Sequence, residues 1–210
     1  MHVRQIQLPC YTTYMKSSLF EKNRLEFFSD AVIAIIITIM VIEFHIPEGT
    51  QFSDLQPFLP TFLAYILSFI YLAIYWNNHH HLLKAAKGVN GGIQWANMGL
   101  LFCLTLIPFA TSWMGKNYEA TAPTVVYGIV LLSASITFFI LQRTIFATLG
   151  KNSPFIRAIG NDHKGKLSPV FYSAAILLAF VHPAIAQIIY VLVALIWIIP
   201  DSRIERAVQE

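Results

Sequence analysis

Long apolar runs separated by short polar segments fill most of the 210-residue chain. A helix that crosses a membrane needs about 20 consecutive, mostly apolar residues. The runs predict six helices, at about residues 25–45, 57–84, 92–114, 121–148, 167–181 and 184–199. In lipid a lone strand would leave its backbone groups unpaired, and no alternating ten-residue pattern indicates a barrel. The pattern therefore predicts an all-α, polytopic membrane protein with six transmembrane helices per subunit.

Composition supports this class. The chain is 56% hydrophobic and only 12% charged, which is too apolar for an ordinary soluble domain of this size. The net charge of +3 comes from basic residues scattered between the predicted helices, which argues against a nucleic-acid site. We expect one transmembrane domain over residues 23–200, with an N-terminal segment at 1–22 and a C-terminal tail at 201–210. Residues 1–20 lack the apolar core of a signal peptide, so the N-terminus is expected to be retained.

The basic residues also predict an orientation, because cytoplasmic loops carry an excess of Lys and Arg. With six spans, both termini lie on the same side as the second and fourth connections. That side holds thirteen basic residues: Arg4, Lys16, Lys22, Arg24, Lys84, Lys87, Arg143, Lys151, Arg157, Lys164, Lys166, Arg203 and Arg206. The other side holds only Lys116. We therefore expect a multi-pass protein of the cell membrane with both termini in the cytoplasm.

The first predicted helix carries a regular stripe. Alternating steps of four and three residues connect Arg24, Phe28, Ala31, Ile35, Thr38 and Ile42. This spacing is typical of a helix that packs along a seam, and periodicity alone favours a core-facing helix of a bundle.

Asp30 lies off this stripe, at a depth where an unpaired carboxylate costs a few kcal/mol or more. It follows Arg24 by about one and a half turns, close to the membrane interface. The expected partners are the Ser29 hydroxyl, Arg24, and the histidines or Trp76 at the end of the second helix. A structural anchor is the favoured role for Asp30, and a proton relay is the alternative.

Three consecutive histidines, His79, His80 and His81, suggest a metal site at first sight. Successive helix positions point about 100° apart, so the three rings cannot face one ion together. We expect them instead at the interface, with a hydrogen bond to Asp30 or Ser29.

Three motifs, in order and at suitable spacing, resemble one family over roughly residues 24–115. "RLEFFSDAV" from residue 24 is similar to the R-x-x-x-F-S-D signature of the transmembrane protein 175 family of potassium channels. "YWNNHHHLL" resembles the W-x-x-H-H pattern that ends the family's second helix, and the run from Asn97 resembles its N-x-x-x-L-F-x-x-x-x-x-P-F stretch. The chain resembles the single-repeat, prokaryotic-type members.

The resemblance implies a potassium-permeable channel, not an enzyme, formed by a homotetramer whose first helices line the pore. It implies no cofactor or metal, and no partners beyond lipid and permeant monovalent cations, above all potassium. By position, Ile35 matches a hydrophobic constriction and Thr38 a hydroxyl layer associated with selectivity, and the implied pore-lining set is Ile35, Thr38, Ile39 and Ile42. The implied motif and helix-bracing set is Arg24, Phe28, Ser29, Asp30, Trp76, His79, His80 and Asn97.

These roles are physically reasonable. A ring of isoleucines can close a narrow pore by excluding water, and threonine hydroxyls can offer oxygen ligands to a partly dehydrated ion. Without the resemblance, we would expect Thr38 only to bond back to a carbonyl one turn earlier.

Two other functions stay open. One is a proton channel or proton-coupled secondary transporter that uses Asp30 and the cluster from His79 to His81, although no broken helices or paired half-repeats are visible. The other is a membrane metalloenzyme built on the histidine run, which the geometry of consecutive helix positions disfavours.

Overall fold

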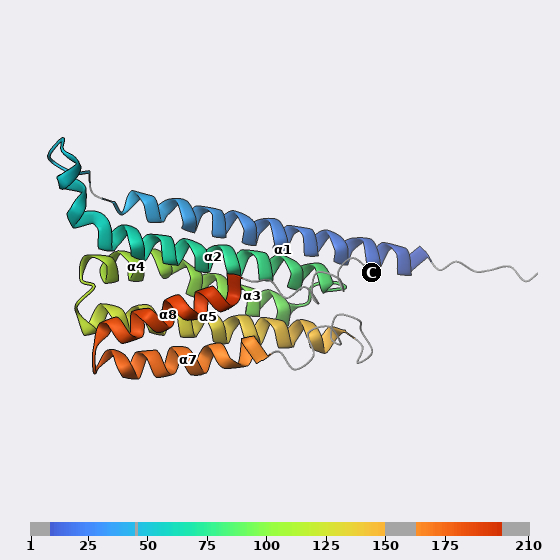
Figure 1. The fold of residues 1–210 in the computed structure, drawn as a ribbon. Helices are drawn as coiled ribbons and strands as arrows, with labels where there is room; N and C mark the ends of the chain where they lie inside the picture. The colour runs from blue at the N-terminus through green and yellow to red at the C-terminus, as the bar shows by residue number, and fades with distance from the viewer. Residues whose placement is uncertain (1–8, 45, 150–162, 199–210) are drawn as a thin grey trace, which may run out of the picture.

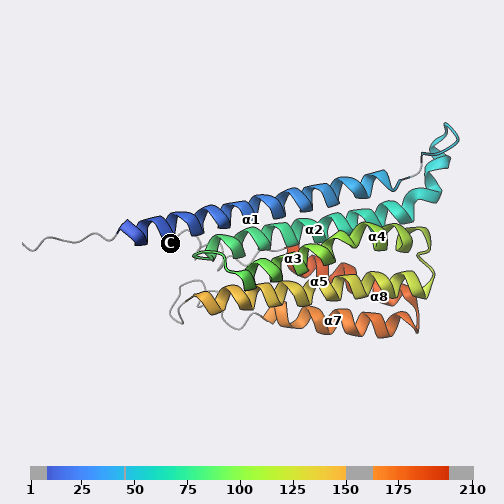
Figure 2. The ribbon, with the colours of Figure 1, turned by 180° about the vertical axis from the view of Figure 1, so that it is seen from behind.

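The computed structural model describes residues 9–44, 46–149 and 163–198, and every regular element in these ranges is a helix. The elements are α1 (Pro9–Ile42), η1 (Phe52–Phe58), α2 (Leu59–Ala85), α3 (Gly91–Thr105), α4 (Ile107–Lys116), α5 (Thr121–Thr148), α7 (His163–Ala179) and α8 (Pro183–Ile198). The helices lie nearly side by side in an elongated bundle, with α1 along one edge (Figure 1). The view from behind shows the same edge position for α1 (Figure 2). The prediction of an all-α architecture is confirmed for the described residues.

Four stretches of the described chain are long and apolar enough to cross a membrane: Glu21–Ile42, Phe52–Ala85, Gly91–Lys116 and Thr121–Thr148. The last two helices are shorter, with 17 residues in α7 and 16 in α8. At about 1.5 Å per residue they are roughly 24–26 Å long, somewhat less than the hydrocarbon thickness of about 30 Å. The chain is a membrane protein, and the count of six spans stays a prediction.

The first helix begins at Pro9, so the predicted start near residue 25 is too late. The prediction placed the boundary where the apolar run begins. Helix formation does not require apolar residues, however, and no glycine or proline interrupts residues 10–42. The polar segment before the apolar run therefore continues as helix.

The third predicted helix is divided in two. α3 ends at Thr105 and α4 begins at Ile107, with Pro108 in the first turn of α4. Proline has no N–H to donate, and its ring clashes with the carbonyl four residues earlier, so a continuous helix cannot pass through this point undisturbed. The prediction of one unbroken helix over 92–114 is thus wrong in detail, although the two pieces together form one candidate span.

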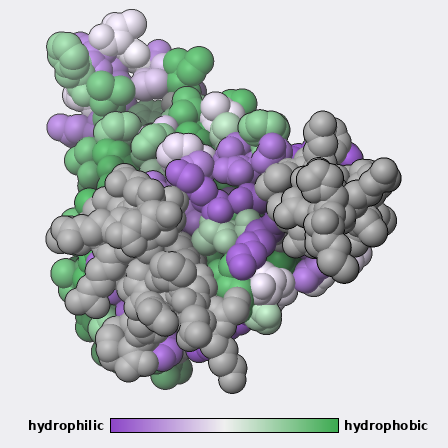
Figure 3. All heavy atoms as spheres, turned by 90° about the vertical axis from the view of Figure 1, so that its right-hand side faces the viewer, coloured by the Kyte–Doolittle hydropathy of each residue, from purple (hydrophilic) through white to green (hydrophobic). Residues whose placement is uncertain are grey.

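The helices pack around a continuous apolar core, with α5 in contact with α3, α4, α7 and α8. α1 packs on α2, α3 and α4. At the end of the bundle where α2 ends and α3 begins, hydrophilic side chains gather between the grey atoms, whereas hydrophobic side chains cover much of the flanks (Figure 3). This distribution is the one expected for a bundle whose flanks contact lipid.

Buried hydroxyl groups connect the helices inside the core. Ser68 Oγ of α2 lies 2.7 Å from Thr111 Oγ1 and 2.9 Å from Tyr127 Oη. Tyr190 Oη of α8 donates to the Thr124 carbonyl at 3.1 Å. Hydrogen bonds of this kind typically hold membrane helices together. Hydrophobic burial contributes little there, because an apolar side chain is equally well accommodated by lipid and by a neighbouring helix.

We predict that Gly128→Ala destabilises the bundle by about 1–3 kcal/mol, because overpacking forces neighbours to move. A Cβ at Gly128 would come within 2.1 Å of Tyr190 Oη, which holds the bond to Thr124. Gly99→Ala is the matched control, because its Cβ would meet nothing closer than a Thr137 methyl at 3.9 Å. Thermal unfolding in detergent should show a lower midpoint for Gly128→Ala alone. Equal midpoints for the two variants would contradict this account of the α5–α8 contact.

Candidate functional site

α1 has two opposed faces. One is buried against the chain's own helices and contains Leu25, Ser29, Ile33, Ile36 and Met40. The other is exposed in the single chain and contains all six residues of the predicted stripe: Arg24, Phe28, Ala31, Ile35, Thr38 and Ile42. Ile35 is 55% exposed and Ile42 79% exposed, so the rest of the chain covers neither side chain. The exposed face is therefore free to meet lipid or other copies of the chain.

Thr38 lies in the middle of the exposed face. Its Oγ1 donates a hydrogen bond of 2.9 Å to the Ile35 carbonyl, the local bond that a threonine in a helix commonly forms. This bond uses the hydroxyl hydrogen and leaves the oxygen lone pairs available. Local bonding and a role as an oxygen ligand are thus compatible at this residue.

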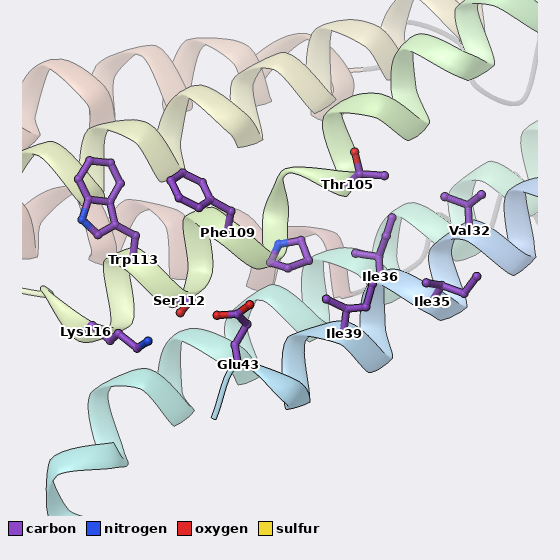
Figure 4. Close-up of a pocket in the computed structure, with 11 residues that line it drawn as sticks. Val32, Ile35, Ile36, Ile39, Glu43, Thr105, Phe109, Ser112, Trp113 and Lys116 are labelled. Carbon is purple, nitrogen blue, oxygen red and sulfur yellow. The ribbon is translucent and has the colours of Figure 1, made fainter. Parts of the chain in front are cut away.

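A groove of about 640 Å³ runs between α1 and the α3–α4 segment. Its lining residues are Val32, Ile35, Ile36, Ile39, Glu43, Thr105, Pro108, Phe109, Ser112, Trp113 and Lys116. Figure 4 shows Glu43, Trp113 and Lys116 toward one end and Val32 and Ile35 toward the other. Ile39 therefore lies on the groove side of α1, next to the stripe rather than on it.

On the buried face, a hydrogen-bonded chain joins three helices. Ser29 Oγ donates to the Leu25 carbonyl at 2.8 Å, so it accepts the bond of 2.9 Å from Asn97 Nδ2. Asn97 Oδ1 then faces His79 Nε2 at 2.6 Å and must accept, which assigns the ring proton to Nε2. Ser29, His79 and Asn97 are all buried, at 0%, 1% and 0% exposure. The three residues link α1, α2 and α3 at one point.

Two further contacts connect α1 to α2 beside this chain. Trp76 Nε1 donates to Asp30 Oδ1 at 2.9 Å, and His80 Nδ1 lies 2.9 Å from Glu26 Oε1. We use the term polar brace for these two pairs together with the Ser29–Asn97–His79 chain. Glu26 and Asp30 of α1 thus each have a partner on α2.

The partners differ in part from those expected. His79 reaches Ser29 only through Asn97, and His80 pairs with Glu26 rather than with Asp30 or Ser29. Among the candidates that the sequence suggested for Asp30, the observed partner is Trp76.

Arg24 is also placed differently from the expectation. It is exposed on the stripe and, among the described residues, forms no ion pair with Asp30. Within one chain it therefore takes no part in the brace. Its position four residues from Phe28 instead places it at the end of the exposed face.

Sequence reasoning missed Glu26 and the contact made by Lys22. Lys22 Nζ donates to the Lys84 and Ala86 carbonyls, both at 2.9 Å. The spacing of these residues could have indicated the contacts. Lys22, Glu26 and Asp30 follow one another at intervals of four residues, so they lie on one side of a helix.

The described residues contain no group of three or more His, Cys, Asp or Glu side chains arranged to hold a metal ion. His79 is buried on the α3 side, whereas His80 is directed to Glu26 on α1. The divergence of neighbouring rings on a helix accounts for this arrangement.

Comparisons with known proteins agree with the motifs. A model of the family described as endosomal/lysosomal potassium channel TMEM175 matches residues 24–108. A protein named as a potassium channel in Chryseobacterium sp. (strain P1-3) is 52% identical over 189 residues, which cover 90% of this chain and 98% of that protein. The chain belongs to the TMEM175 family. Because this is a family of channels, the chain is not an enzyme, and the predicted family is confirmed.

Two other similarities extend the comparison. The endosomal/lysosomal proton channel TMEM175 of Danio rerio is 27% identical over 145 residues, which cover 67% of this chain and 27% of that protein. The crystal structure of a lysosomal potassium-selective channel TMEM175 homolog from Chamaesiphon minutus superimposes with a TM-score of 0.74 at 24% identity. The match covers 86% of this chain and 98% of that structure, and at this identity it shows a shared fold.

We predict that Asn97→Ala destabilises this TMEM175 protein by about 1–3 kcal/mol, because it leaves the buried Nε2–H of His79 without an acceptor. Asn77→Ala is the control, since Asn77 lies at the same end of α2 as His79, is only partly buried, and has no side-chain hydrogen bond to the described residues. Thermal unfolding and the yield of folded protein from membranes measure the difference. A loss confined to the Asn77 variant, or none in either, would refute the role of Asn97 in the brace.

Proposed function

We propose that the chain is one subunit of a potassium-permeable cation channel of the cell membrane, with α1 lining the pore. The observation that carries the proposal is the division of α1 into two faces. Ser29 and Asp30 are turned toward α2 and α3, whereas the stripe from Phe28 to Ile42 is left uncovered by the rest of the chain. A helix held this firmly on one side, with an exposed stripe on the other, is suited to face a shared axis.

The stripe supplies both elements of a simple pore. Four Ile35 side chains around an axis would form a hydrophobic constriction that excludes water in the closed state. Thr38, one turn further along, would add a ring of hydroxyl oxygens that can replace part of the hydration shell of a potassium ion. Ile42, and Ile39 on the groove side, would complete the pore wall. The name of the relative from Chryseobacterium supports potassium as the permeant ion.

The proposed channel subunit crosses the membrane six times. α3 and α4 together count as one span, and tilting of the bundle or local thinning of the bilayer would accommodate the shorter α7 and α8. Six spans place both termini on one side, and the excess of Lys and Arg assigns that side to the cytoplasm. Residues 23–200 would form the channel domain, with segments 1–22 and 201–210 in the cytoplasm.

A proton channel or proton-coupled transporter is the second candidate, favoured by the name of the Danio rerio relative. It would use Asp30 and the cluster from His79 to His81. Three arrangements weigh against it: Asp30 is bound to Trp76, His79 is buried against Asn97, and both lie away from the exposed stripe. Potassium conduction is therefore the better supported function.

The direct test is ion flux into liposomes that contain the purified protein. We predict uptake of potassium driven by a set membrane voltage, with sodium flux lower and without any requirement for a proton gradient. Empty liposomes give the background. Flux that saturates and needs a proton gradient would support the transporter and would overturn the channel proposal.

Ile35 and Thr38 can be tested as a pair in the same liposomes. Ile35→Asn keeps a similar side-chain length but allows water to persist, so the resting leak should rise and discrimination between potassium and sodium should fall. Thr38→Ala removes a hydroxyl without adding a group that attracts water, so selectivity should fall while the leak stays low. If Ile35→Asn left both leak and selectivity unchanged, Ile35 would not form the constriction, and another helix face would have to line the pore.

We predict a homotetramer in detergent, because one chain contributes one exposed stripe and two or three helices around an axis would fill it with side chains. Light scattering on a preparation that still conducts measures the mass of the assembly. A monodisperse monomer, dimer or trimer in such a preparation would exclude the tetramer.

A further inference from the structure

The contacts between α1 and α2 form a regular ladder. Lys22 lies against the Lys84 carbonyl, Glu26 against His80, and Asp30 against Trp76. Each step moves four residues forward on α1 and four residues back on α2, as expected for antiparallel helices in constant register. At the far end Phe44, two residues beyond the end of α1, lies beside α2, with its ring centroid 6.2 Å from that of Phe62 and 5.3 Å from that of Tyr65. The three polar contacts therefore share one register.

The Glu26–His80 and Asp30–Trp76 contacts oppose sliding of α1 along α2 in one direction but not in the other. Suppose that α1 moved by one turn toward the C-terminal end of α2. Glu26 would then face Lys84 and Asp30 would face His80, so that each carboxylate would again meet a basic group. Glu26 and Asp30 thus oppose this displacement only weakly.

Movement in the opposite direction is a different case. Asp30 would then face Leu72, which is completely buried. A carboxylate against a buried leucine at membrane depth is costly, so Asp30 itself prevents this displacement. The remaining question is what prevents movement toward the end of α2.

We propose that Lys22 is a positioning residue that prevents α1 from moving toward the C-terminal end of α2. Its ammonium group donates to the Lys84 and Ala86 carbonyls, both at 2.9 Å. Carbonyls at a helix C-terminus lack partners inside the helix and carry the negative end of the helix dipole, so a half-buried cation binds them well. A one-turn displacement would place Lys22 opposite Gly88, beyond the last residue of α2.

The consequence for conduction rests on the proposed function. A displacement by one turn moves every α1 residue by about 6 Å along the axis. Ile35 and Thr38 would then leave the levels that the brace assigns to them. Lys22 acts together with the Ser29–Asn97 bond, which holds α1 on α3 and so opposes displacement from a second helix.

Cross-linking across the far end of the ladder measures the register without relying on ion flux. After replacement of Cys10 and Cys103, Phe44→Cys is combined with Phe62→Cys to report the observed register, or with Ile66→Cys to report the displaced one. A short bifunctional thiol reagent is applied in native membranes, so a low yield of purified protein does not prevent the measurement. The rate ratio of the two pairs is compared among backgrounds with Lys22, Lys22→Met, Lys22→Arg and Lys87→Met.

The proposal predicts that Lys22→Met changes the ratio at least threefold toward the Ile66 pair. Lys22→Arg should restore the parent ratio, because the guanidinium also donates to carbonyls, and Lys87→Met should leave it unchanged, because Lys87 is exposed and lies beyond α2. An unchanged ratio in Lys22→Met, or an equal change in Lys87→Met, would overturn the proposal. Loss of both cross-links in Lys22→Met would also overturn it, because a role in register predicts a shifted contact rather than a general loss of structure. Since no step requires conduction, a failure of the channel proposal would be seen separately in the flux measurements.

Discussion

The cost of an unpaired polar group in a membrane governs the position of α1. A buried donor or acceptor without a partner costs about 1–3 kcal/mol, and an unpaired charge costs more. In the observed rotation of α1, Trp76 and His80 supply partners for Asp30 and Glu26, and Ser29 accepts from the buried amide of Asn97. Once these bonds form, the rotation of the helix about its own axis is determined. The side opposite them is then the exposed stripe.

This coupling explains why the residues that brace the helix and those proposed to line the pore alternate along one short segment. Ser29 and Asp30 lie between Phe28 and Ala31, yet the helical turn of about 100° per residue separates the two roles. A substitution in the brace would therefore change the proposed pore without touching it. The apolar half of the buried face, which includes Ile33 and Met40, adds packing against the neighbouring helices. Packing alone would specify the rotation less sharply, because lipid is as apolar as leucine.

The sequence predicted much of this arrangement because its strongest signals are local. The stripe from Arg24 to Ile42 follows from helical periodicity. Thr121–Thr148 has the predicted bounds because its apolar run lies between the polar turn at residues 115–117 and the polar segment that starts at Gly150. The partners of the brace could not be predicted, since the choice among Trp76, His79 and His80 depends on how two helices rotate against each other. Lys22 looked like one of many cytoplasmic charges, because its role depends on where α2 ends. The break before Pro108 was visible in the sequence, but the apolar run around it concealed the consequence.

If the brace directs the stripe of α1 into the pore, cysteines on the two faces of α1 will differ in how their modification by a thiol reagent affects ion flux. Single cysteines at Ile35, Thr38 and Ile42, and at Ile33 and Met40 on the buried face, would be treated with a small, charged thiol reagent during flux measurements. The account predicts that modification blocks potassium flux at the three stripe positions and leaves it unchanged at the two buried ones. Block at Ile33 and Met40, with no effect at Ile35 and Thr38, would show that the opposite face of α1 lines the pore and would contradict the account.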